Sequence, residues 1–119
     1  MDRNSSRWKF YTHEQDNNQT MYAMTGKLTA QTGKRPVLVN ILTRASHLVG
    51  EMAGCRRYIV SEDAANETTV WVFEMWDDKQ SHDESLKNEQ VRALIAEARP
   101  ILVGAPEGAE LRVAGGFGI

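Results

Sequence analysis

The sequence has 119 residues, with 14 lysines and arginines against 16 aspartates and glutamates, so its formal net charge is -2. This length predicts a single domain. The near balance of charge, without a basic stripe, argues against a nucleic-acid-binding protein. No apolar stretch approaches the roughly 18 residues that a membrane helix needs, which argues against membrane association. One cysteine, Cys55, excludes an internal disulfide, and the N-terminus lacks the apolar segment of a secretory signal. We therefore expect a cytoplasmic protein.

Residues 1–19 are polar but also contain Trp8, Phe10 and Tyr11. A tail that serves only to solvate the chain seldom contains aromatic residues. We therefore predict an N-terminal arm that packs against the domain or against a neighbouring subunit. The alternative is a lid over a binding site.

Regular patterning begins at residue 20. Over residues 20–31, apolar and polar residues alternate with a period of about two, which predicts a strand. From Pro36 to Met52, apolar residues recur every three or four positions, so we expect an amphipathic helix that ends before Gly54. The same strand-type alternation occurs on either side of a polar turn, over residues 55–62 and 68–76, and this pattern predicts a hairpin.

The second half of the chain repeats the order of helix and strand. Asp77 or Asp78 can cap a second helix, which we expect to break or kink near Asn88 before its apolar stripe resumes and to end at Pro100. The pattern over residues 110–116 predicts a last strand, and we expect the glycine-rich tail to extend it. The order β-α-β-β-α-β predicts an α+β ferredoxin-like sandwich, a four-stranded antiparallel sheet with two helices on one face.

The strand over residues 68–76 is apolar on both of its faces. By alternation, one face carries Val70, Val72 and Trp76, and the other carries Trp71, Phe73 and Met75. Two helices cover only one face of the sheet, and each large side chain left exposed on the other forgoes roughly 1.5–3 kcal/mol of burial. We therefore expect a homodimer in which the second faces of two sheets pack together.

Several stretches resemble the antibiotic biosynthesis monooxygenase family, and within it the bacterial quinol monooxygenase branch. They are AMTGKLTAQTGK (23–34), GCRRYIVSED (54–63), WVFEMWDDKQSHDESL (71–86), VRALIAEARPIL (91–102) and GGFG (115–118). The resemblance makes residues 20–119 one domain of this family and implies a dimeric α+β barrel. It also implies oxidation of a small aromatic phenol, quinol or anthrone by dioxygen without flavin or metal, in which the deprotonated substrate passes an electron directly to dioxygen.

Only some of the family's site residues are matched at the corresponding positions of this sequence. Family members that oxidise aromatic polyketides keep a tryptophan where Trp76 stands, a tyrosine where His82 stands and an asparagine where Val72 stands. His82 can replace the phenol as a hydrogen-bonding and proton-transfer group, whereas Val72 removes one polar contact. Haem-degrading members need an asparagine, a tryptophan and a histidine, and the matching positions here are Gly26, Ser85 and Ile95. The resemblance therefore excludes haem degradation.

Two side chains are candidate catalytic bases. Histidine suits proton transfer near neutral pH, so His82 is the first candidate. Its alternative role is an exposed residue of a surface helix. Glu74 shares a strand face with Val72 and Trp76, and a carboxyl group among apolar neighbours has a raised pKa and can accept a proton. Its alternative role is a salt bridge to Arg56, Arg57 or Lys27, across the sheet or across the dimer.

We expect the substrate to lie between the sheet and the helices, in an apolar, water-poor pocket. Ser85, one turn after His82, can add a hydroxyl contact. The other predicted pocket residues are Trp76, Val72, Leu38, Leu42, Leu94 and Ile95. The sequence contains no metal-binding motif and no nucleotide-binding loop. Two other functions remain open, a non-oxidative enzyme such as an isomerase or decarboxylase, and a small-molecule-binding dimer without catalysis.

Overall fold

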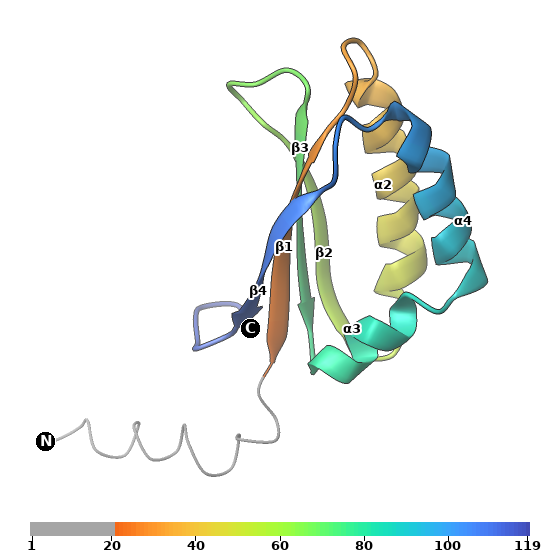
Figure 1. Cartoon of the computed structure of the whole chain (residues 1–119). Helices are drawn as coiled ribbons and strands as arrows, with labels where there is room; N and C mark the ends of the chain where they lie inside the picture. The colour runs from red at the N-terminus through yellow and green to blue at the C-terminus, as the bar shows by residue number, and fades with distance from the viewer. Residues whose placement is uncertain (1–20) are drawn as a thin grey trace, which may run out of the picture.

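The computed structural model describes residues 21–119, and the predicted N-terminal arm lies outside them. Four strands form one antiparallel sheet in the order β2-β3-β1-β4. Three α-helices and one 3-10 turn lie on one side of this sheet (Figure 1). In chain order the elements are β1 (Tyr22–Thr29), α2 (Arg35–Gly50), β2 (Cys55–Glu62), β3 (Thr69–Trp76), α3 (Lys79–Ser85), α4 (Glu89–Ala98), η1 (Arg99–Ile101) and β4 (Glu107–Arg112). The predicted α+β ferredoxin-like fold is confirmed.

The second predicted helix is two helices. Asp78 caps α3 by accepting a hydrogen bond from the backbone N–H of Ser81 at 2.8 Å. Asn88 has an extended backbone, and its side chain accepts hydrogen bonds from the N–H groups of Gln90 and Val91. An N-cap of this kind starts a new helix. The direction of the chain can therefore change between α3 and α4, and α3 turns toward the end of the sheet (Figure 1).

The prediction for the C-terminus was wrong in two respects. The last strand begins at Glu107, three residues earlier than predicted, and ends at Arg112. The tail does not extend it. Gly118 has a φ of 90°, which glycine adopts readily, and its carbonyl accepts a hydrogen bond from Arg57 Nη2 at 2.9 Å. Because Arg57 lies on β2, at the opposite edge of the sheet from β4, the tail crosses the face that the helices leave open.

The hydrophobic core lies between the sheet and the helices and has two parts. One part surrounds the fully buried side chains of Leu38 and Val70. The other surrounds Trp76, whose side chain is also fully buried. Leu28 and Leu42, which pack against the first part, and Met24 and Tyr58, which pack against the second, line a cavity between the two parts. The fold thus leaves a space within its own core.

The open face of the sheet carries the side chains that alternation assigned to it. Ile59, Trp71 and Leu111 are each more than two-fifths exposed there. Met75 is nevertheless buried, because the C-terminal tail lies over its end of the face and borders a shallow hollow of about 480 Å³. Within residues 21–119, no helix is long and apolar enough to cross a membrane.

Candidate functional site

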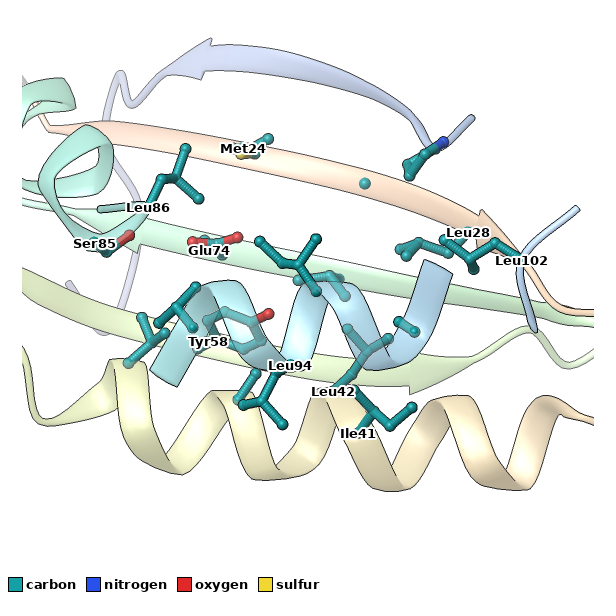
Figure 2. A pocket seen from close by; sticks show the side chains of 18 residues that line it. Met24, Leu28, Ile41, Leu42, Tyr58, Glu74, Ser85, Leu86, Leu94 and Leu102 are labelled. Carbon is teal, nitrogen blue, oxygen red and sulfur yellow. The ribbon is translucent and has the colours of Figure 1, made fainter. Parts of the chain in front are cut away.

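The cavity between the sheet and the helices has a volume of about 310 Å³ (Figure 2). Strands β1, β2 and β3 line it on one side, and α2 and α4 line it on the other. Its lining is apolar except for three side chains, Tyr58, Glu74 and Ser85. Glu74 and Ser85 lie toward the α3 end, and Leu28 and Leu102 lie toward the other end (Figure 2). The cavity therefore fits an elongated apolar molecule with a polar group at one end.

Gly26 helps to create this space. It lies in the middle of β1, paired with Val72 on β3 and with Gly108 on β4. A Cβ atom built at Gly26 meets nothing closer than the Glu107 carbonyl oxygen at 3.9 Å. Met24 and Leu28, its neighbours on the same strand face, both line the cavity. The missing side chain at residue 26 thus leaves an opening that a larger residue would fill.

Glu74 presents a carboxyl group to the cavity. Its side chain is only 14% exposed, and its Oε1 accepts a hydrogen bond from Trp76 Nε1 at 3.0 Å. Burial raises the pKa of the Glu74 carboxyl, while the bond from Trp76 and the nearby His82 oppose that rise. The carboxyl therefore binds a proton more tightly than an exposed glutamate does.

The alternative role of Glu74, a salt bridge across the sheet, does not occur among the described residues. Arg56 pairs instead with Asp77 at 2.6 Å. Arg57 donates hydrogen bonds to backbone carbonyls, including that of Gly118. The Lys27 ammonium lies over the Trp71 ring, on the open face. Glu74 faces the helices, which is the side that strand alternation predicted.

His82 is buried, so its alternative role as an exposed residue of a surface helix does not hold. Its side chain is 6% exposed, because α3 packs it against the end of the sheet. The ring lies 5.1 Å from the Tyr22 ring and 5.8 Å, edge to face, from the Trp76 ring. Its Nδ1 is 3.0 Å from Asp83 Oδ1, and its Nε2 is 4.0 Å from Glu74 Oε1. His82 does not line the cavity and lies behind Glu74.

The structure brings most of the predicted site residues to one cavity. Those that line it are Val72, Glu74, Ser85, Leu42, Leu94 and Ile95. Leu38 and Trp76 are fully buried in the core and do not line it. The Ser85 hydroxyl donates a hydrogen bond to the His82 carbonyl oxygen at 2.6 Å, so its proton is already used within α3. Ser85 can still accept a hydrogen bond from a ligand.

Tyr58 is a cavity residue that the sequence analysis did not identify. It lies on β2 directly opposite Glu74 on β3, and the side chains of such a pair lie on the same face of the sheet. Burial and the negative charge of Glu74 raise the pKa of Tyr58 well above that of an exposed tyrosine, so the phenol stays protonated. Two sequence signals could have revealed it, namely the hairpin register and the alternation of Tyr58 with Val60.

The chemistry available in the cavity is therefore that of one carboxyl group and two hydroxyl groups in apolar surroundings. The carboxyl can accept a proton, and the Tyr58 phenol can donate a hydrogen bond to a ligand oxygen. In the part of the chain that the structure describes, no three histidine, cysteine or acidic side chains are grouped to hold a metal ion.

These features define a ferredoxin-like α+β protein with an internal apolar pocket and a buried carboxyl group. The family model described as antibiotic biosynthesis monooxygenase matches residues 21–97, more than half of the chain. The chain belongs to this family. No match was found among proteins with curated descriptions.

Solved structures agree with this membership. A Chloroflexus aurantiacus protein assigned as an antibiotic biosynthesis monooxygenase is 35% identical and has a TM-score of 0.75, and the match covers 83% of this chain and 98% of that one. A Deinococcus radiodurans protein with the same assignment is 19% identical, with a TM-score of 0.73 and coverage of 82% and 97%. A Mycobacterium tuberculosis protein is 18% identical, with a TM-score of 0.74 and coverage of 82% and 98%. The last two show the fold alone.

Filling the space at Gly26 is expected to block the cavity. Gly26→Leu adds a side chain to the cavity side of β1, so it should weaken binding of a neutral naphthyl fluorophore by about tenfold or more, ~1.4 kcal/mol. Gly26→Ala, which adds one methyl group, should have a smaller effect. Titration of probe fluorescence measures both.

Thr25→Leu is the matched control for this experiment, because residue 25 is the next on β1 and its side chain points to the opposite face. It should leave binding of the fluorophore unchanged. Equal probe affinity in Gly26→Leu and the wild type would show that the probe binds elsewhere.

Proposed function

We propose that this protein is a monooxygenase that oxidises a small aromatic phenol, quinol or anthrone with dioxygen, using neither flavin nor metal. The observation that carries the proposal is the Glu74 carboxyl group, which is buried at the side of a largely apolar cavity within a fold of this family. A base in dry surroundings is what the first step of such a reaction requires, because the aromatic hydroxyl must lose its proton before oxygen reacts.

Glu74 would remove the proton from the substrate hydroxyl, and the electron-rich anion would reduce dioxygen directly. Overall, the substrate loses two hydrogen atoms and gains one oxygen atom. The second oxygen atom and the two hydrogen atoms leave as water, so dioxygen is the only oxidant. The apolar lining would disfavour water near the anion and its oxygen adduct, and this protects them from side reactions.

Tyr58 and Ser85 would orient the substrate. Both lie on the cavity with Glu74, and Tyr58 is opposite it on the neighbouring strand. A protonated phenol can donate a hydrogen bond to the substrate oxygen as negative charge develops there. The apolar ring system would extend toward Leu28 and Leu102 at the far end of the cavity (Figure 2).

Oxygen uptake with a panel of hydroquinones, naphthols and anthrones tests the proposal. We expect uptake of one dioxygen per product, with no added flavin, metal or reductant. Turnover of a small carbonyl compound without oxygen uptake would instead establish a non-oxidative enzyme. Saturable binding of these aromatics without any turnover would establish a binding protein. The burial of both Glu74 and His82 argues against this last alternative, because a protein that only binds has no need of a buried base.

We infer that the protein acts as a homodimer whose open sheet faces pack together. Ile59, Trp71 and Leu111 lie exposed on this face, and the apolar tail residues Phe117 and Ile119 border the same hollow as Ile59 and Leu111. Light scattering after size-exclusion chromatography should give the mass of two chains, and Ile59→Asp should shift it to one, because a charge buried in an apolar interface is costly. Val37→Asp, on an exposed position of α2, is the control. A stable monomer of the wild type at micromolar concentration would contradict the inference.

A further inference from the structure

Three ionisable side chains form a continuous line from the cavity to the protein surface. Glu74 lines the cavity and is 14% exposed, His82 behind it is 6% exposed, and Asp83 beyond His82 is 48% exposed. The contacts between them are 4.0 Å from Glu74 Oε1 to His82 Nε2 and 3.0 Å from His82 Nδ1 to Asp83 Oδ1. No other ionisable side chain is needed to connect the cavity carboxyl with solvent.

The hydrogen bond to Asp83 determines which nitrogen of His82 carries the proton. An ionised carboxylate can only accept hydrogen bonds, so Nδ1 must be the donor. Asp83 is ionised at neutral pH, since the bond from His82 is the main cause that holds its pKa below the usual range. In the neutral ring, Nε2 is therefore unprotonated, and it lies 4.0 Å from Glu74 Oε1.

The ring is held in this orientation by its neighbours. Tyr22 lies on one side at 5.1 Å and the Trp76 ring approaches it edge-on at 5.8 Å. Trp76 Nε1 also donates to Glu74 Oε1, so one side chain positions both members of the pair. The separation of 4.0 Å is longer than a hydrogen bond, as is common in sites without substrate.

We propose that Glu74, His82 and Asp83 form a proton path, in which His82 Nε2 takes the substrate proton from Glu74 and Asp83 holds His82 in the accepting tautomer. This inference rests on the proposed function and assigns roles within the same site. His82 would exchange a proton with Glu74, and Asp83 would be a positioning residue.

The proton and electron changes balance at each step. Glu74 takes the hydroxyl proton of the substrate and becomes a neutral acid. That proton then passes from the carboxyl oxygen to His82 Nε2, which leaves a carboxylate at Glu74 and an imidazolium between two carboxylates. The anion forms a carbon–oxygen bond to dioxygen and reduces it to a bound peroxide, and the same proton returns through Glu74 to that peroxide. The hydroperoxide then loses water as its O–O bond breaks and a C=O bond forms, and the second hydrogen of the water comes from the same substrate carbon. The path moves one proton out and back, and it transfers no electrons.

The charged groups around His82 favour this role. Lys79 Nζ lies 3.6 Å from Asp83 Oδ1 and 2.8 Å from Glu110 Oε2. Tyr22 donates to the same oxygen of Glu110, and burial is the main cause that raises the pKa of Tyr22 to about 12, so Tyr22 does not exchange protons near neutral pH. Among residues 21–119, the ionisable groups that face His82 and its partners are Tyr22 on β1, Cys55 and Tyr58 on β2, Glu74 on β3, Lys79 and Asp83 on α3, and Glu110 on β4.

Steady-state oxygen uptake in His82→Gln and Asp83→Asn, measured against pH, tests the path. We expect His82→Gln to lower kcat by about 100-fold with KM unchanged, since proton-transfer groups contribute this much or more. Asp83→Asn should lower kcat by about tenfold or more and alter the pH profile of kcat, because an amide does not fix the tautomer. Glu84→Gln, an exposed carboxyl on the same helix, should retain the wild-type profile.

The outcomes separate this inference from the proposed function. If the wild type consumes oxygen and both variants keep its kcat and pH profile, the proton path is wrong and the monooxygenase stands. If the wild type consumes no oxygen with any substrate, the proposed function fails. Nitrogen NMR of the free protein then still tests the path, because it reports the tautomer without turnover. The Nδ1–H form of His82 in the wild type, with a shift of population in Asp83→Asn, supports it, and the Nε2–H form overturns it.

Discussion

Glu74→Gln is expected to abolish most oxygen uptake while leaving the cavity and its ligands in place. A general base contributes about 10²–10⁴-fold to a rate, and a glutamine of the same shape cannot accept a proton. Its amide oxygen can still accept the hydrogen bond that Trp76 Nε1 donates to Glu74 at 3.0 Å. We therefore expect kcat to fall by about 10²–10⁴-fold and the dissociation constant of an aromatic ligand to change little.

Glu84→Gln is the matched control, because it makes the same chemical change at an exposed position of α3. It should leave both kcat and ligand binding at wild-type values. A Glu74→Gln enzyme with undiminished kcat would show that the base is another group, and Tyr58 and His82 would then be the next residues to replace.

The same substitution is expected to change how the free energy of unfolding depends on pH. Burial raises the pKa of Glu74 in the folded state, so the folded protein binds this proton more tightly than the unfolded chain does. The wild type should therefore lose stability as the pH rises from the unfolded pKa of a glutamate through the raised pKa of Glu74. Glu74→Gln should lack this decrease, and urea denaturation at a series of pH values compares the two. If the free energy of unfolding depended on pH in the same way in the wild type and in Glu74→Gln, Glu74 would not be held in a buried site.

Trp76→Ala is expected to have the largest effect on stability in this protein. The Trp76 side chain is fully buried and is the largest of the fully buried side chains among the described residues. Replacing a buried tryptophan with alanine costs about 3–5 kcal/mol, because contacts are lost and a cavity remains. Single domains have a total stability of about 5–15 kcal/mol, so the variant should be marginally folded.

Trp76→Phe separates the role of this side chain in packing from its role at the site. It keeps most of the buried apolar volume but removes the Nε1 donor to Glu74. We expect a smaller loss of stability than in Trp76→Ala and a further rise in the pKa of Glu74, which would shift the pH profile of oxygen uptake upward. Urea denaturation measures the loss of stability. Val37→Ala, at an exposed position, is the control and should change the free energy of unfolding by no more than about 0.5 kcal/mol.

Much of the fold could be predicted because its signals are local. A period of two marks the strands and a period of three to four marks α2, so the order of elements and the ferredoxin-like class follow from patterns within short windows. Alternation along β3 also placed Glu74 and Val72 on the helix-facing side, where both line the cavity. Position in the sequence left Asp77 and Asp78 as candidate helix caps, and Asp78 is the one that caps α3.

Other features depend on contacts between residues far apart in the sequence. His82 lies in a polar segment and would be exposed on an isolated helix, but α3 packs against the end of the sheet, where Tyr22 and Trp76 enclose the ring. The tail was predicted to extend β4, whereas it crosses the open face to reach Arg57. Neither arrangement leaves a periodic signal, because each depends on how separate elements meet.

The candidate site shows the same division. The sequence alone placed Glu74 on the same strand face as Val72 and Trp76, since side-chain direction on a strand follows from local alternation, but it left a salt bridge open as the alternative to the pocket. Which groups surround that carboxyl depended on the pairing of strands and the docking of α3. The β2–β3 register places Tyr58 opposite Glu74, and the docking of α3 sets His82 and Asp83 behind it. Gly26 has no side chain, and the space that this leaves becomes part of a cavity only when the sheet and the helices pack around it.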